Sequence, residues 1–350
     1  MVLTKLFRLD ALHLDPRAVE EICRDVLSGK LVVFPTETVY GLGASIYTPE
    51  AVRRIYTAKN RPMDNPLIIH ISRREHLQEV AAHIPDTAWR IVEVAWPGPL
   101  TLVLKKGRAV PPEASAGLPT AAIRMPAHPV AEKLIDCTGP VAAPSANISG
   151  RPSPTTGHHV LVDMFGRADI IVDAGETLFG IESTIVDVSV EPPRLLRPGA
   201  MPIERITEIL GVEIVVTDTS RGYTEAEKAL APGMKYRHYA PKTPLILVEG
   251  SGPRGLVEVV EEIRREGKRV AVIVSRENLK LYQGVADRVV AVGSIENLFE
   301  VAKNLFIALR ELDRFGVDVA VSESFPERGI GLAVMNRLRK ASTKIIRLNS

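Results

Sequence analysis

The chain is poor in cysteine, in aromatic residues, in net charge and in long apolar runs. Its only two cysteines, Cys23 and Cys137, exclude a disulfide framework and a cysteine-rich zinc site, and such usage is typical of a reducing cytosol. Aromatic residues make up 5% of the chain, which leaves few stacking platforms for single-stranded nucleic acid. No apolar run approaches the roughly 18 residues that a membrane-spanning helix needs. We therefore expect a cytoplasmic protein without a membrane span.

The charge balance and the length narrow the class of protein further. The 44 basic and 42 acidic side chains give a formal net charge of +2, so any nucleic-acid binding must be local. With 350 residues, 45% of them hydrophobic, the chain is long enough for two domains with their own cores. The composition along the chain predicts a first domain over residues 1–211, a polar linker over 212–243 and a second domain over 244–350.

Both domains are predicted to be of the α/β class. In the first, an amphipathic helix over 17–28 and a strand over 31–34 are followed by a mixture of short strands and helices. Further strands are predicted at 67–71, 100–104, 121–125, 141–143, 170–173 and 183–188. In the second, the strands at 245–248, 270–274, 289–292 and 317–321 alternate with helices, which indicates a small parallel sheet.

The stretch P-T-E-T-V-Y-G-L-G, residues 35–43, combines hydroxyls, one carboxylate and two glycines directly after a strand. Gly41 and Gly43 would let the backbone approach a ligand closely or adopt a positive φ. The same residues also fit an ordinary strand-to-helix loop with turn glycines. Taken alone, the stretch slightly favours the ordinary loop.

Lys59 and Arg61, in A-K-N-R-P-M-D-N-P-L, lie where a helix must end before Pro62. Two cations this close in a loop can converge on one polyphosphate, the lysine as a point charge and the arginine as a bidentate fork. The helix dipole also favours cations at this end. It does not explain the density of polar loop residues at Asp64 and Asn65.

Hydroxyl and amide side chains follow a strand in V-A-A-P-S-A-N-I-S-G, residues 141–150. Ser145 and Asn147, together with backbone N–H groups, are typical of an anion-binding nest. A serine-capped or Asx turn would have the same sequence.

Three further residues carry polar groups into apolar surroundings. Arg124 lies within an apolar strand run, and since arginine is rarely buried without a partner, it must point outward or meet an anion. Ser183 lies at the mouth of a strand, and Arg197 ends another strand.

Several common site motifs are absent or incomplete. No Walker A sequence is present, and no G-x-S-x-G surrounds Ser145. His158 and His159 lack the spacing of metal ligands. A G-x-G-x-x-G match at 250–255 lies between a strand and a helix, but Pro253 removes a backbone donor. No acidic residue clearly ends the next strand, and Glu277 is the nearest candidate. We interpret this match as a βα turn.

In combination, the stretches at 35–43, 58–67 and 141–150 resemble the YrdC/Sua5 family, and S-T-I-V-D and L-L-R-P-G reinforce the match. The rest of the chain is similar to the long Sua5 form, in which a linker with K-Y-R-H-Y-A-P leads to a further domain. The resemblance implies a YrdC-like twisted mixed sheet with a central concave cavity, and a smaller Rossmann-like parallel α/β domain.

The resemblance also implies an enzyme, a nucleotidyltransferase that makes threonylcarbamoyl-adenylate. Its substrates would be L-threonine, bicarbonate or CO₂, and ATP with Mg²⁺, and pyrophosphate would be released. A downstream threonylcarbamoyl transferase would then carry the group to tRNA as the t6A modification. No side chain is assigned to a metal.

The resemblance implies two sets of site residues, one that binds ATP and one that binds L-threonine. The catalytic candidates belong to the ATP-binding set and are Lys59, Arg61, Ser145 and Asn147. Arg124 suits the threonine carboxylate because a guanidinium pairs with carboxylates in bidentate fashion. The ATP-binding candidates are Lys59, Arg61, Asn65, Thr120, Ser145, Asn147, Ser153, Arg197, Tyr236 and His238. The L-threonine-binding candidates are Thr36, His70, Arg124, Ala143 and Ser183.

Tyr236 to Tyr239 place four ring or cationic groups in a row within the linker. They could close over the nucleotide as a lid that excludes water, or anchor a solvated linker.

Two other function classes stay open at this stage. One is a non-catalytic double-stranded RNA-binding module, with weak RNA affinity, on a basic surface formed by Arg53, Arg54, Lys59, Arg61, Lys105, Lys106 and Arg108. The other is an NAD-binding oxidoreductase built on the loop at Gly250. No RNP-like aromatic run and no acidic ribose partner support them, so the synthase is favoured.

Overall fold

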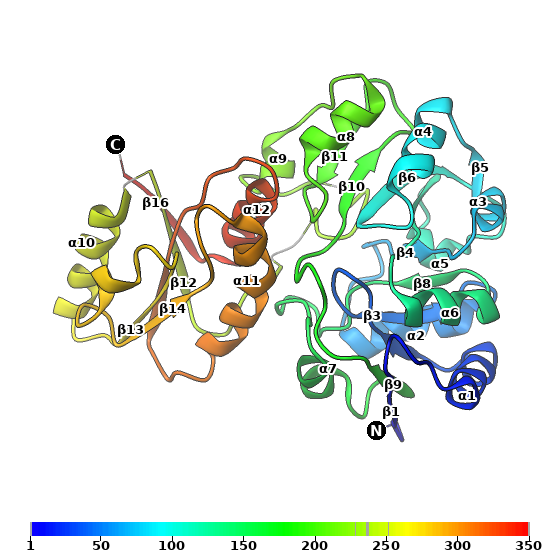
Figure 1. The fold of residues 1–350 in the computed structure, drawn as a ribbon, viewed down its shortest axis with the longest axis horizontal. Coiled ribbons are helices and arrows are strands. Elements are labelled where there is room, and N and C mark those ends of the chain that lie inside the picture. Colours follow the sequence, from blue (N-terminus) through cyan, green and yellow to red (C-terminus); the bar gives the residue numbers. More distant parts are fainter. Residues whose placement is uncertain (1, 228, 236–237, 251, 349–350) are drawn as a thin grey trace. The chain divides into compact units, whose positions relative to one another are not determined.

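The computed structural model describes residues 2–227, 229–235, 238–250 and 252–348. The chain forms two compact units (Figure 1). The first unit comprises Met1–Ser149, Ser153–Ser220 and Glu225–Tyr236, and the second comprises Gly150–Pro152, Arg221–Thr224 and Arg237–Ser350. Part of the segment predicted as a linker therefore belongs to the first unit.

The first unit is built on an 11-stranded sheet whose path runs β1-β9-β2-β3-β8-β4-β7-β6-β10-β11, with β5 paired to β6 beside it. Parallel and antiparallel pairs alternate irregularly, which confirms the predicted mixed sheet. The strands are β1 (Lys5–Arg8), β2 (Val32–Phe34), β3 (Gly41–Ser45), β4 (Ile68–His70), β5 (Ala81–His83), β6 (Leu100–Lys106), β7 (Thr120–Arg124), β8 (Val141–Ala143), β9 (Ile170–Asp173), β10 (Thr184–Asp187) and β11 (Arg194–Arg197).

The helices of this unit begin and end at residues that the sequence marks. Asp15 caps the first helix by accepting a hydrogen bond from the backbone of Arg17 (3.0 Å), and the second ends at Asn60 in a left-handed conformation, before Pro62. The helices are α1 (Pro16–Leu27), α2 (Pro49–Lys59), α3 (Arg74–Val80), α4 (Asp86–Ala95), α5 (Pro112–Ser115), α6 (Pro129–Thr138), α7 (Gly157–Met164) and α8 (Ile203–Leu210); the short α9 (Asp218–Arg221) follows at the unit boundary.

The stretch at 35–43 does not form the expected strand-to-helix loop, because Gly41 to Ser45 form β3, antiparallel to β2. Neither glycine of this stretch has a positive φ. A Cβ on Gly43 would lie 2.6 Å from Cγ1 of Val141 and 2.8 Å from Cε1 of Phe34. Gly43 therefore allows close packing of β3 against its neighbours, and the alternative of a positive φ at this residue is wrong.

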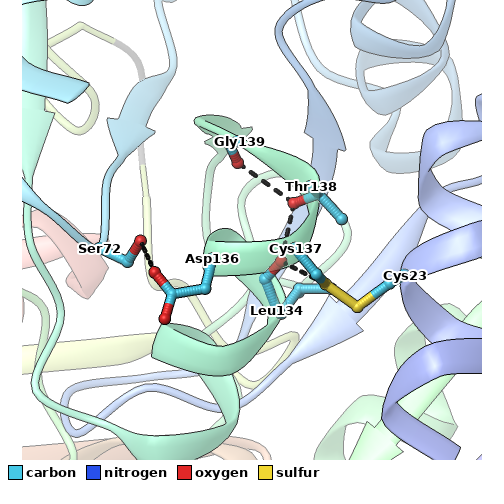
Figure 2. The surroundings of a disulfide bond; sticks show 7 residues. All are labelled: Cys23, Ser72, Leu134, Asp136, Cys137, Thr138 and Gly139. Carbon is cyan, nitrogen blue, oxygen red and sulfur yellow. Dashed lines mark hydrogen bonds between the residues drawn. A yellow bond between two sulfur atoms is a disulfide. The ribbon is translucent and has the colours of Figure 1, made fainter. Parts of the chain in front are cut away.

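A single disulfide joins Cys23 in α1 to Cys137 in α6, 114 positions apart in sequence, with a Cα–Cα distance of 6.0 Å (Figure 2). One disulfide does not make a disulfide framework, so the exclusion of such a framework holds. The bridge does overturn the use of the cysteine count as a sign of a reducing compartment. The number of cysteines could not reveal this disulfide, because only the packing of α1 against α6 over the sheet brings the two sulfur atoms together.

The second unit is a five-stranded parallel sheet in the order β14-β13-β15-β12-β16, as the alternating pattern predicted. Figure 1 shows α10 on one side of this sheet and α11 and α12 on the other. The prediction from the sequence did not include the strand β16. The elements are β12 (Leu245–Glu249), α10 (Gly252–Arg265), β13 (Val270–Val274), a 3₁₀ turn (Leu279–Tyr282), β14 (Arg288–Ala291), α11 (Leu298–Leu312), β15 (Val319–Glu323), α12 (Gly331–Ala341) and β16 (Lys344–Arg347).

Among the described residues, no helix is both long enough and apolar enough to cross a bilayer.

Candidate active site

Lys59 lies at the end of α2 and binds the loop after β8. Its side chain is buried, with 1% of the residue exposed, and Nζ donates to the backbone carbonyls of Ser145 and Asn147. In return, the backbone N–H of Ser149 donates to the carbonyl of Lys59 (2.9 Å). Ser145 Oγ donates to Oδ1 of Asn147 (2.6 Å), so three catalytic candidates form one connected group.

Arg61 and Asn65 form the loop that leads from this group into β4. Arg61 Nε donates to the carbonyl of Asn65 (3.1 Å), and Nη2 donates to that of Pro66 (2.9 Å). Asn65 is buried, and its Oδ1 has no hydrogen-bond partner among the described residues. The parallel pairing of β4 with β7 brings Thr120, at the start of β7, to the edge where this loop enters the sheet. The loop that follows Lys59 thus carries a buried amide acceptor and a guanidinium held by backbone carbonyls.

The threonine candidates gather around one face of the sheet. His70 in β4 is paired in register with Arg124 in β7, and Arg124 with Thr101 in β6. Since side chains two positions apart in a strand share a face, all three lie on the face of Ile68, Val103 and Ala122. These apolar residues pack with Ala231 and Met234 of the segment after residue 225. Residues 229–235 of the predicted linker, which we call the covering segment, thus pack on the face that carries the polar side chains.

Arg124 is the centre of this polar group and is 3% exposed. Its guanidinium donates through Nε to the carbonyl of Gly98 (3.2 Å) and through Nη1 to Oγ1 of Thr38 (2.8 Å). Its Nη2 lies 2.6 Å from Oε1 of Glu37, and both side chains of this ion pair are 4% exposed. The hydroxyls of Thr38 and Thr36 are 2.8 Å apart, so the stretch at 35–43 surrounds the arginine. Arg124 meets an anion in the interior, as one of the two sequence alternatives required.

Burial lowers the pKa of His70 to about 3, and the neighbouring Arg124 guanidinium adds to the effect. The imidazole is therefore neutral at physiological pH. Its Nδ1 has no hydrogen-bond partner among the described residues. A neutral imidazole beside a guanidinium can exchange a hydrogen bond with a polar ligand through such a nitrogen without adding charge.

Ser183 and Arg197 close the other side of this group. Ser183 Oγ lies 2.8 Å from Oγ1 of Thr101, and its carbonyl accepts hydrogen bonds from Nε (3.2 Å) and Nη2 (2.8 Å) of Arg197. Arg197 Nη1 also donates to the carbonyl of Pro232 (3.4 Å), so this side chain ties the sheet to the covering segment. The guanidinium predicted to bind phosphate thus directly contacts a threonine candidate.

Four candidates remain, of which two lie in the first unit, one lies in the second unit and one lies outside the described residues. Ala143 ends β8, beside Ile68 of β4, and Ser153 is fully buried with Oγ donating to Oε1 of Glu182 (2.6 Å). Tyr236 lies outside the described residues. His238 belongs to the second unit, where its ring lies 5.7 Å from that of Tyr239.

Comparisons with known proteins agree with this arrangement. The model of the Sua5/YciO/YrdC family, described as "Telomere recombination", matches residues 25–199, and the model described as "Threonylcarbamoyl-AMP synthase, C-terminal domain" matches 201–343. A threonylcarbamoyl-AMP synthase of Pyrococcus abyssi is 51% identical over 321 residues, covering 91% of this chain and 92% of the relative. The enzyme of the same name from Bacillus subtilis is 46% identical and covers 89% of each chain. The chain belongs to the Sua5 family.

Solved structures support the same assignment. The structure of P. abyssi Sua5 with L-threonine has a TM-score of 0.91 and 47% identity, and covers 99% of this chain and 100% of that one. Escherichia coli YciO, at 22% identity and a TM-score of 0.51, covers 57% of this chain and 96% of its own and shows the fold alone. The family, the two-part fold and the enzyme class predicted from the sequence are confirmed.

The RNA-binding alternative is not favoured for this Sua5 chain. Two of its basic residues are already paired on the surface. Arg53 lies 3.0 Å from Glu50 and 3.3 Å from Glu113, and Arg54 lies 2.7 Å from Asp169. These contacts neutralise part of the basic surface that the alternative requires.

Four polar residues that contact the candidates were absent from the candidates drawn from sequence: Glu37, Thr38, Thr101 and Glu182. Glu37 and Thr38 adjoin a candidate in the chain, so their position was a usable signal. Thr101 and Glu182 become visible only when the strands pair, because each is linked to its candidate partner across the sheet or between loops.

Proposed function

We propose that this chain makes threonylcarbamoyl-adenylate from L-threonine, bicarbonate or CO₂, and ATP, and releases pyrophosphate. The proposal rests chiefly on one observation: the polar side chains around Arg124 and the Lys59–Ser145–Asn147 group are both built into the first unit, on neighbouring strands and loops. An amino-acid pocket and an anion site side by side are what the reaction needs.

The Lys59–Ser145–Asn147 group, with Arg61 and Arg197, is assigned to the triphosphate. Transfer of a nucleotidyl group depends mainly on alignment and charge neutralisation, which fixed cations and backbone N–H groups provide. Among the described residues there is no cluster of three or more side chains that could hold a metal ion. Mg²⁺ therefore enters this proposal with ATP, as part of the substrate, and no protein ligand is assigned to it.

The group around Arg124 is assigned to L-threonine. Arg124 would bind the threonine carboxylate through guanidinium N–H groups that do not donate to its protein partners. Thr36, His70 and Ser183 would form further hydrogen bonds with the amino acid. The threonine amine and bicarbonate give a carbamate and water, and the carbamate oxygen attacks the α-phosphate as pyrophosphate leaves. No side chain is assigned as a general base, and desolvation of the carbamate would activate it.

The decisive test is product formation from ATP, labelled bicarbonate and each amino acid in turn. A labelled adenylate with L-threonine alone is expected. Lys59→Ala and Arg61→Ala should each lower its rate at least about tenfold, which corresponds to roughly 1.4 kcal/mol. The exposed residues Lys133 and Arg74 provide matched controls as Lys133→Ala and Arg74→Ala. Wild-type ATP–pyrophosphate turnover in both site variants would refute the assignment.

We also propose that Tyr236 and His238 help to close the site against water. The covering segment supports this idea because Pro232 binds Arg197, and Lys235 lies 2.7 Å from Asp64 in the loop after α2. In the full-length chain, Tyr236→Ala and His238→Ala should shorten the lifetime of the bound adenylate. An unchanged lifetime in both variants would remove the lid.

The product would pass to a threonylcarbamoyl transferase that modifies tRNA, and ATP and tRNA would make the cytoplasm its place of action. Release of the adenylate into a coupled reaction with a purified transferase and tRNA tests this step.

A further inference from the structure

The second unit contains a cavity of ≈ 240 Å³ at the carboxyl ends of its parallel strands. Val248 near the end of β12, Ser275 just after β13 and Glu323 at the end of β15 all line it. The adjacent strands β12 and β15 continue in opposite directions along the sheet: β12 leads to β13, and β15 leads to β16. The cavity therefore lies at a topological switch point. In open α/β sheets, ligands bind in this position.

Two carboxylates set the charge of the cavity. Glu323 is 7% exposed; its carboxylate accepts hydrogen bonds from the backbone of Ser275 and from Nδ2 of Asn278 (2.8 Å), and burial raises the pKa of this carboxyl. Glu277 lies at the same cavity. No Lys, Arg or His is among the described residues that line it. The interior therefore suits a group that donates hydrogen bonds and disfavours phosphate.

Ser275 is the observation that points to a ligand. The residue is fully buried, it lines the cavity, and its Oγ has no hydrogen-bond partner among the described residues. A buried hydroxyl without a partner costs free energy, so native proteins seldom keep one. A ligand hydroxyl in the cavity would provide the missing partner.

The G-x-G-x-x-G match gains a role at Gly252, the first residue of α10. Gly252 lines the cavity, and a Cβ built on it would meet no atom within 4 Å, so the backbone there faces open space. In dinucleotide-binding folds an acidic residue near such a motif binds ribose hydroxyls. In the chain the next strand is β13, and Glu277, shortly after its end, also lines the cavity. In space β12 lies between β15 and β16, and the last residue of β15 is Glu323.

We propose that this cavity binds the ribose diol of a ribonucleoside, with Glu323 and Ser275 contacting the hydroxyls. Asn278 orients the carboxylate, and Val248, Leu256 and Ile295 provide an apolar wall for the base. The cavity is smaller than the several hundred Å³ typical of whole cofactor sites, so it takes a nucleoside portion only. This site is separate from the ATP site proposed in the first unit, and it stands whether or not that assignment holds.

The test is calorimetric titration of the full-length protein with uridine, cytidine and guanosine. Adenosine is left out because the ATP site would also bind it. At least one nucleoside should bind with a dissociation constant below about 1 mM. The 2′,3′-dideoxy form of that nucleoside should bind at least about tenfold more weakly, because it lacks the diol. Titration with the 5′-monophosphate distinguishes the two possible ligands. If it binds more tightly than the nucleoside, the ligand is a nucleotide; if it binds equally or more weakly, the ligand is the free nucleoside.

Two variants separate a ligand site from a structural role. Ser275→Ala should weaken nucleoside binding about fivefold without lowering the thermal stability of the free protein, because the hydroxyl has no partner to lose. Glu323→Gln should weaken binding at least about tenfold. The control is Ser342→Ala, a half-buried serine of this unit whose Oγ donates to the carbonyl of Leu338 (2.7 Å) and which does not line the cavity. It should lower stability and leave binding unchanged. If no nucleoside binds, if the dideoxy form binds equally well, or if Ser275→Ala binds like wild type, the proposal is wrong.

Discussion

Replacing both Cys23 and Cys137 with alanine should remove a large part of the stability of the first unit. The bridge closes a loop of 114 positions. In the chain-entropy model a loop of this length lowers the entropy of the unfolded chain by about 16 cal/mol/K, which is about 5 kcal/mol at 25 °C. Measured bridges commonly contribute about 2–4 kcal/mol, so we expect a loss within about 2–5 kcal/mol.

Tryptophan fluorescence during urea unfolding isolates this unit. The only two tryptophans, Trp89 and Trp96, lie in the first unit, in and directly after α4. Trp96 is buried, and its indole donates to the carbonyl of Leu100 (2.7 Å), so its emission should change when the unit unfolds. The midpoint should fall in the double variant with little change in the dependence on urea concentration.

Wild-type protein treated with a thiol reductant is the matched control. Reduction should lower its midpoint to that of the double variant, and the variant itself should not respond to the reductant. If the variant unfolds at the wild-type midpoint, or if the reductant acts equally on both proteins, the entropy argument fails.

The remaining predictions concern the buried polar group. Glu37→Gln should destabilise the first unit by about 3–5 kcal/mol, since it leaves the Arg124 guanidinium without its buried anion; a loss under about 1 kcal/mol in the same fluorescence assay would contradict this. The folded pKa of His70, about 3, lies below its unfolded value near 6.5, so the stabilising effect of the neutral ring is full above about pH 6.5 and is lost as the pH falls towards about 3. Relative to His70→Gln, wild type should lose about 1.4 kcal/mol per pH unit in that window, and parallel pH profiles of the two proteins would disprove the buried neutral state.

The sequence predicted the Lys59–Ser145–Asn147 group more completely than the group around Arg124, for a physical reason. Lys59 ends α2, and Ser145 and Asn147 follow β8, in two short stretches whose composition is unusual for ordinary turns, so local chemistry identified them. Arg124 and Ser183 were found as single polar residues in apolar runs. Their partners, such as Thr101, look like ordinary strand residues and gain meaning only from strand register.

Strand order escaped prediction because it depends on pairings between distant segments. The sequence predicts a loop at β3 because glycines are also turn residues, and nothing local shows that Val141 would collide with a larger side chain at Gly43. In the second unit, the regular alternation of strands and helices made the parallel sheet predictable. Even there, the adjacency of β12 and β15, which places Glu323 at the same cavity as Gly252, was not accessible from chain order.

The covering segment changes how the lid must be tested. A truncation after Leu210 would remove Tyr236 and His238, but it would also remove Ala231 and Met234, which pack on the sheet with Ile68 and Ile185.

It would remove the carbonyl of Pro232 from Arg197 as well. Loss of activity in the truncated chain would therefore follow from exposed apolar surface or a released guanidinium as readily as from a missing lid. Single substitutions in the full-length chain keep these contacts, so only they can assign an effect on product lifetime to Tyr236 or His238.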